Sequence, residues 1–208
     1  MLSIETIVTF SAASIALGVA PGPDNIFVLT QSALHGRSAG IAVMLGLCTG
    51  LIGHTLTVAL GVAAIFQTSA MAFSVLKIIG AAYLLYLAWK AFRASAEKLG
   101  GEQGGEIGLW RLYRRGIIMN ITNPKVSLFF LAFLPQFVDA KRGLISLQIL
   151  ALGGLFILAT ILVFGGIALL AGTLGGWLNR SARAQRMLNR VAGTVFVCLA
   201  LKLATAER

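Results

Sequence analysis

The sequence predicts an all-α membrane protein with six transmembrane helices arranged as two inverted three-helix repeats, with helices 1 and 4 broken at proline motifs. Composition is the first observation behind this prediction: of 208 residues, 58% are hydrophobic and 12% are charged. So few polar side chains cannot cover a surface in water, and lipid is the expected solvent. The second observation is that apolar stretches of roughly 20 residues, the length that crosses a bilayer, recur between charged clusters. The third is that prolines interrupt two of these stretches.

The apolar stretches are predicted to be helices, because lipid offers the backbone no hydrogen-bond partner outside its own segment. The first stretch carries Glu5, lacks a basic start and continues past any small-residue cleavage site, so we expect a membrane span and not a cleaved signal peptide. Almost no sequence remains for a separate soluble domain. The predicted spans are 4–33, 39–66, 71–92, 116–138, 146–173 and 188–205.

Two of the spans contain prolines where a helix should be continuous. The first holds Pro21-Gly22-Pro23, and the fourth holds Pro124 within Asn123-Pro124-Lys125. Proline lacks the N–H donor of the helix ladder and clashes with the preceding turn. Both spans are therefore expected to break near the middle of the membrane.

The chain also divides into two similar halves. Pro23-Asp24 corresponds to Pro124-Lys125, and a glycine-rich stretch, GGEQGG, separates the halves. Each half has three spans, an odd number, so the second half must enter the membrane in the opposite sense, as in the inverted repeats of many transporters. We expect residues 1–208 to form a single transporter domain, with repeat 1 at about 1–92, a cytoplasmic linker at about 93–115 and repeat 2 at about 116–208.

Basic residues in the short loops predict the orientation. The net charge of +10 does not indicate nucleic-acid binding, because Lys and Arg lie between spans instead of along one amphipathic face. If the amino terminus is outside the cytoplasm, eleven basic residues fall on the cytoplasmic side and four on the other, which favours both termini outside. The eleven are Arg37, Lys90, Arg93, Lys98, Arg111, Arg114, Arg115, Arg180, Arg183, Arg186 and Arg190, and the four are Lys141, Arg142, Lys202 and Arg208.

Asp24 and Lys125 are the ionisable residues that follow the two predicted breaks. A charge near the bilayer centre costs at least ~2.5–3.5 kcal/mol, so such residues are functional candidates. Opposite charges at equivalent positions predict a site for a zwitterion, with Lys125 near a carboxylate and Asp24 near an ammonium group. The alternative is that the two charges only neutralise each other. Polar side chains beside the breaks extend the candidate site: Asn25, Asn120, Thr122 and Asn123.

His54 lies near the middle of the second span. Because an imidazole titrates near neutral pH, His54 is a candidate for carrying a coupling proton, as is Asp24; a neutral hydrogen bond to a neighbouring helix is the alternative. Gly46-x-x-x-Gly50 and the pair Gly165-Gly166 indicate close helix contacts.

The motifs around the breaks carry a resemblance. Ala20-Pro21-Gly22-Pro23-Asp24, Asn123-Pro124-Lys125, the stretch LKIIGAAYLLYLAWKAF and the start RVAG of the last span resemble the lysine exporter (LysE) superfamily, most of all its homoserine/threonine efflux (RhtB-type) branch. The resemblance covers essentially the whole chain. It implies a multi-pass protein of the bacterial inner membrane that exports amino acids by proton antiport, not an enzyme, with no cofactor. A lone acid near the midplane favours neutral substrates such as homoserine, threonine or leucine. A homodimer is one option, and the sequence leaves the oligomeric state open.

Two other functions are alternatives. A divalent-cation exporter of the same superfamily would need clustered carboxylates, His or Cys in the membrane, whereas here a lysine accompanies the aspartate, so no metal site is expected. A membrane redox conductor would need two thiols able to meet, and Cys48 and Cys198 lie alone on the second and sixth spans. Neither hydrolase nucleophile motifs nor zinc-protease motifs are present.

Overall fold

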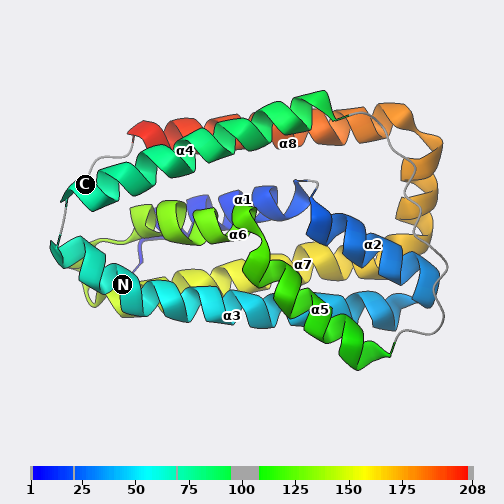
Figure 1. The fold of residues 1–208 in the computed structure, drawn as a ribbon, viewed down its shortest axis with the longest axis horizontal. Helices are drawn as coiled ribbons and strands as arrows, with labels where there is room; N and C mark the ends of the chain where they lie inside the picture. The colour runs from blue at the N-terminus through cyan, green and yellow to red at the C-terminus, as the bar shows by residue number, and fades with distance from the viewer. Residues whose placement is uncertain (1, 21, 69, 95–107, 206–208) are drawn as a thin grey trace.

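The computed structural model describes residues 2–20, 22–68, 70–94 and 108–205, and the regular elements in these ranges are helices (Figure 1). The glycine-rich part of the predicted linker lies outside them. The longer helices are α1 (Ile4–Val19), α2 (Pro23–His35), α3 (Arg37–Thr68), α4 (Ala70–Arg93), α5 (Leu109–Thr122), α7 (Ile145–Arg180) and α8 (Ala182–Thr205). Between α5 and α7 lie α6 (Pro124–Leu128), η1 (Phe129–Phe133), η2 (Leu134–Phe137) and η3 (Ala140–Arg142).

The predicted break in the first span is confirmed. Helix α1 ends at Val19, and α2 starts at Pro23 after a bend of more than 40°. Gly22 caps α2 in extended conformation, and Pro23 occupies the first turn, where the missing N–H has no helical partner in any case. Pro21, the other predicted breaker, lies outside the described residues.

The break at Pro124 is also confirmed. Helix α5 ends at Thr122, Asn123 caps α6, and the two parts of the span differ in direction by 50°. After α6 the chain continues as the π-helical η1 and the 3-10 helix η2, instead of the regular helix expected over 116–138. Pro135 explains part of this change, because it cannot donate to the helix ladder. Short π-helical segments are rare and occur frequently at functional sites.

Several helices are longer than their predicted spans. Helix α5 starts at Leu109 instead of 116, α7 ends at Arg180 instead of 173, and α8 starts at Ala182 instead of 188. Hydropathy detects only the apolar part of a helix. A helix can extend beyond the hydrocarbon layer into water, where basic side chains are solvated.

The helices form two layers, with α1 and α6 between them (Figure 1). Helix α3 packs against α5 and α7 in one layer, and α4 packs lengthwise against α8 in the other (Figure 1). Helix α1 contacts both α7 and α8, while η1 contacts both α3 and α4. Both chain ends lie at one end of the molecule. The core between the layers contains a cluster of phenylalanines, and Phe10, Phe129, Phe130 and Phe133 are at most 1% exposed.

Three helical stretches of the described chain are long and apolar enough to cross a membrane: 37–61, 145–171 and 185–205. The number rises to five if α1 with α2, and α5 with the segment to Phe137, each count as one span. Helix α4, the third predicted span, is outside this set. Large apolar side chains such as Leu60, Leu158 and Leu162 are exposed on these helices, which suits a lipid-facing surface.

Glycines allow α3 and α5 to touch. A Cβ atom on Gly46 would collide with the Tyr113 carbonyl oxygen, and one on Gly116 would collide with the Val43 carbonyl oxygen. Gly50 faces Asn120 in the same way, so the predicted contact at Gly46-x-x-x-Gly50 is confirmed. The expectation for the pair Gly165-Gly166 is half wrong. A Cβ atom on Gly165 would lie 3.5 Å from Sδ of Met44, whereas one on Gly166 would meet nothing within 4 Å.

Gly116→Ala is expected to destabilise the protein by about 1–3 kcal/mol, because the added methyl group meets backbone that cannot move aside without separating α3 from α5. The measurement is thermal unfolding of the purified protein in detergent. Gly53→Ala is the matched control, since a Cβ there meets nothing within 4 Å and alanine favours the helix. Equal melting temperatures for the two variants would contradict this account of the packing.

Candidate functional site

The two helix breaks face each other and are joined by Asn123. Its Nδ2 donates a 2.7 Å hydrogen bond to Oδ2 of Asp24, and its Oδ1 accepts a 3.0 Å bond from the backbone N–H of Lys125. The second bond fixes the orientation of the amide, because only its oxygen can cap the start of α6. The amide nitrogen must then point at the carboxylate. Asn123, which caps α6, therefore also binds Asp24, the acid in the first turn of α2.

The side chain of Lys125 binds the carbonyl groups at the C-terminal end of α1. Its Nζ donates to the carbonyl oxygens of Leu17 and Ala20, at 3.2 Å each. Nδ2 of Asn25 donates to the Gly18 carbonyl oxygen at 2.6 Å. The last carbonyls of a helix have no partner within it and carry partial negative charge, so an ammonium group is well placed there. Lys125 and Asn25 thus satisfy backbone groups released by the break.

The charged groups are deeply buried. Asp24 is 3% exposed and Lys125 is 7% exposed. Burial of a charge is costly unless hydrogen bonds compensate, and here Asn123 and the α1 carbonyls supply them. The two charges form no direct ion pair within 4.0 Å in the described part of the chain. Each therefore has its own polar partners, which the simple neutralisation alternative does not predict.

Asp24 and Lys125 nevertheless line the same small cavity. Its volume is about 20 Å³, which is room for roughly one water molecule. Two acceptor atoms of its lining, Oδ1 of Asp24 and Oδ1 of Asn120, are buried without a hydrogen-bond partner. The remaining lining residues come mainly from α1 and α7: Leu17, Gly18, Leu47, Val126, Phe156, Thr160 and Phe164. The cavity thus combines unsatisfied acceptors with one ammonium donor between largely apolar walls.

Gly22 lies directly beside Lys125. A Cβ atom at this position would be 3.2 Å from Nζ of Lys125 and 3.7 Å from Oδ1 of Asn25. The glycine is extended, a conformation that any residue adopts, so its small size and not its backbone freedom matters here. A larger residue would press on the ammonium group that caps α1.

His54 contacts the site from α3. Its Nε2 lies 3.3 Å from the carbonyl oxygen of Asn120, so Nε2 must carry the proton in this contact. The imidazole also lies against Phe130, with 5.5 Å between ring centroids. The Asn120 carbonyl is at the end of α5, one turn before the break. His54 is therefore adjacent to the cavity wall but is not one of the lining residues.

The sequence expectations for the remaining site residues have mixed outcomes. Asn120 and Asn123 lie at the cavity and at the bridge, whereas Asn25 points at the end of α1 and does not line the cavity. Thr122 does not line the cavity; it is exposed and donates to the carbonyl oxygen of Ile118 on its own helix. Thr160 was missed, although a hydroxyl at the centre of the apolar fifth span was the available signal.

The chemistry of the alternative functions is not assembled in the described residues. Cys48 is buried, Cys198 is exposed, and both are free. No group of three or more His, Cys, Asp or Glu side chains that could hold a metal ion occurs in the described ranges.

Known proteins are similar to this sequence along most of its length. The family model described as LysE type translocator matches residues 15–207. The homoserine/homoserine lactone efflux protein of Salmonella typhimurium is 33% identical over 194 residues, which is 93% of each chain, and the protein of the same name from Salmonella typhi has the same identity and coverage. A Vibrio cholerae protein named as an uncharacterized membrane protein is 30% identical over 99% of this chain and 100% of its own. No solved structure matches significantly. The chain is therefore a multi-pass membrane protein that belongs to the LysE type translocator family.

Proposed function

We propose that the protein exports neutral amino acids across the bacterial inner membrane by proton antiport. The observation that carries the proposal is the buried cavity that Asp24 and Lys125 share. A zwitterion presents an ammonium group and a carboxylate a few ångströms apart, and the cavity presents the complementary pair. Homoserine is the preferred candidate, because two relatives are named for the efflux of homoserine and its lactone.

In this proposal each charged end of the substrate replaces a contact in the site. The ammonium group binds Oδ1 of Asp24 and Oδ1 of Asn120, the two acceptors of the cavity lining that have no hydrogen-bond partner. The carboxylate replaces the carbonyl oxygens of Leu17 and Ala20 as the acceptor of the hydrogen bonds from Nζ of Lys125. Since about 20 Å³ cannot hold an amino acid, α1 and α2 must separate from α5 and α7 to admit it. Substrate binding and helix movement are thereby coupled through Lys125.

We further propose that the movement follows an inverted repeat, residues 1–92 against 116–208 joined by the linker 93–115. The packing supports this: α3 pairs with its counterpart α7, α4 pairs with its counterpart α8, and the contact of α1 with α7 mirrors that of α5 with α3. The 24 residues of α4 make a helix of about 36 Å, long enough for a sixth span. In this topology both termini are periplasmic and the basic ends of α4 and α5 are cytoplasmic.

Proton coupling is assigned to Asp24 and His54. Protonation of Asp24 would remove the charge that holds the ammonium group, which favours release of the substrate. His54 is placed to carry a proton between water and the end of α5, because it bonds to Asn120 beside the cavity. A divalent cation is a poorer cargo, since the ammonium group of Lys125 lines the same cavity and would repel it.

Asp24→Asn and Lys125→Gln are each expected to lower the initial rate of labelled homoserine transport in membrane vesicles by at least about tenfold, because one charge of the zwitterion loses its partner. Lys141→Gln, an exposed lysine in η3, is the control and should transport normally. The amount of each protein in the membrane is measured alongside. Wild-type rates in both site variants would remove the site proposal.

His54→Gln is expected to reduce transport driven by an imposed pH gradient and to spare homoserine exchange at equal pH, because glutamine can keep the hydrogen bond to Asn120 but cannot titrate. His35→Gln, which changes the histidine at the end of α2, serves as the control. Equal loss of both activities in His54→Gln would assign this residue to packing and not to coupling.

A further inference from the structure

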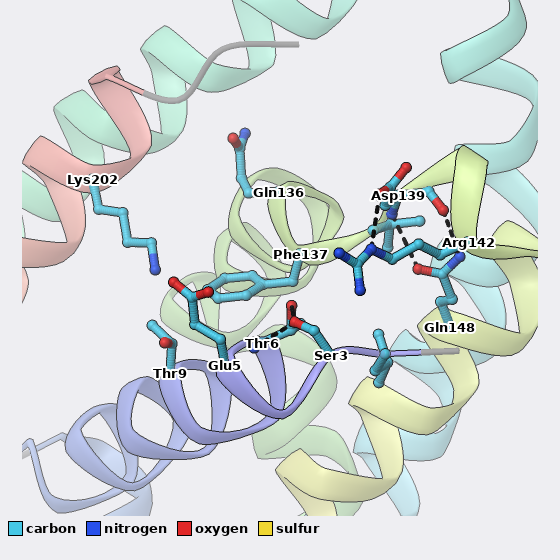
Figure 2. Close-up of a pocket in the computed structure, with 12 residues that line it drawn as sticks. Ser3, Glu5, Thr6, Thr9, Gln136, Phe137, Asp139, Arg142, Gln148 and Lys202 are labelled. Carbon is cyan, nitrogen blue, oxygen red and sulfur yellow. Dashed lines mark hydrogen bonds and ion pairs between the residues drawn. The ribbon is translucent and has the colours of Figure 1, made fainter.

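A second and larger pocket opens at the end of the molecule that carries both termini. It lies between the first turns of α1, the segment from η2 to η3 and the last turns of α8, and its volume is about 330 Å³ (Figure 2). Small-molecule sites typically have volumes of ~300–1,000 Å³. The pocket at the termini is therefore large enough for an amino acid, unlike the cavity at the helix breaks.

An acid and a base face each other across this pocket. Figure 2 shows the carboxylate of Glu5, from α1, and the ammonium group of Lys202, from α8, pointing toward each other beside Phe137. No ion pair within 4.0 Å joins them in the part of the chain that the structure describes. Nζ of Lys202 lies 4.6 Å from the centroid of the Phe137 ring. Glu5 and Lys202 are both exposed, so a ligand can reach them from water.

The opposite wall of the pocket is held in place by Gln148. Its Oε1 accepts from the backbone N–H of Asp139 at 3.0 Å, and its Nε2 donates to the carbonyl oxygens of Asp139 and Gly143 at 2.8 and 3.2 Å. Asp139 in turn pairs with Arg142 at 3.1 Å. Gln148 is only 4% exposed. A buried side chain with three hydrogen bonds to one loop gives this wall a fixed shape.

A continuous stack of phenylalanines connects this pocket to the cavity at the helix breaks. Phe156 lines the inner cavity and contacts Phe129, with 5.0 Å between centroids. Phe129 contacts Phe133 at 4.8 Å, and Phe133 contacts Phe137, which lines the outer pocket, at 5.1 Å. Phe10 closes the stack from the side, at 5.8 Å from Phe129 and 5.1 Å from Phe137. These phenylalanines therefore fill the space between the inner cavity and the outer pocket.

We propose that the pocket at the termini is a second binding site for zwitterionic amino acids, in which Glu5 binds the ammonium group and Lys202 binds the carboxylate, beyond the aromatic stack that closes the inner cavity. The inference rests on the proposed function for the identity of the ligand. The opposed charges repeat the chemistry of Asp24 and Lys125. A ligand that leaves the inner cavity when the stack opens would meet this pair before it reaches water.

The test is protection of a reporter cysteine in the purified, detergent-solubilised full chain. Thr9→Cys, one turn after Glu5 in the pocket lining, is introduced together with Cys48→Ser and Cys198→Ser, and its rate of reaction with a charged maleimide is followed. L-homoserine is expected to slow labelling at least threefold. 4-Hydroxybutyrate, which lacks the ammonium group, and 3-aminopropanol, which lacks the carboxylate, are expected to have no effect. Gln136→Cys is a second reporter on the other wall.

Variants separate this site from the inner one. Glu5→Gln and Lys202→Gln are each expected to abolish protection by L-homoserine, whereas Asp24→Asn is expected to retain it while losing transport. Absence of protection at both reporters, or protection that survives in Glu5→Gln and Lys202→Gln, would overturn the proposal. Loss of protection in Asp24→Asn would overturn it too, because the reporter would then follow the inner site. If Asp24→Asn transports normally while protection behaves as expected, the inner-site proposal fails and the outer site stands.

Discussion

The constraint on which the structure depends is that backbone groups released by two helix breaks inside the bilayer must find partners within the protein. The side chains that meet this need are the same ones that form the site. Lys125 and Asn25 bind the carbonyls at the end of α1, and Asn123 caps α6 while it holds Asp24. In the proposed function, structural and transport roles therefore coincide in these residues, and repair of the breaks would remove the site.

This coincidence supplies a physical link between binding and movement. Lys125 has two competing acceptors in the proposed cycle, the α1 carbonyls in the closed structure and the substrate carboxylate when the cavity is occupied. A ligand shifts a conformational equilibrium only through a difference in affinity between the states. Here the difference lies in the ammonium group of Lys125, which cannot hold the end of α1 and the substrate with the same hydrogen bonds. In this proposal the structure, with its small cavity of about 20 Å³, is the closed state of the equilibrium.

The sequence allowed prediction of the features that follow from local chemistry. Prolines 23 and 124 broke their helices as expected, because a missing donor acts whatever surrounds it. The meeting of the two breaks was also predicted, because Asp24 and Lys125 hold equivalent positions in the two predicted repeats. The partners of each charge were not predictable, since the bond from Asn123 to Asp24 depends on how two helices approach each other. The contribution of Thr160 and Phe156 on α7, and the π-helical turn after α6, likewise depend on tertiary packing.

In the proposed cycle, Asp24 and Lys125 hold the two ends of one substrate in a common cavity. Structure determination in lipid nanodiscs with saturating L-homoserine would reveal this arrangement. We expect one homoserine between the two helix breaks, its ammonium group on the Asp24 carboxylate and its carboxylate on the Lys125 ammonium group, with the bonds from Lys125 to Leu17 and Ala20 broken. Homoserine bound elsewhere, with Lys125 still on the carbonyls of α1, would contradict it.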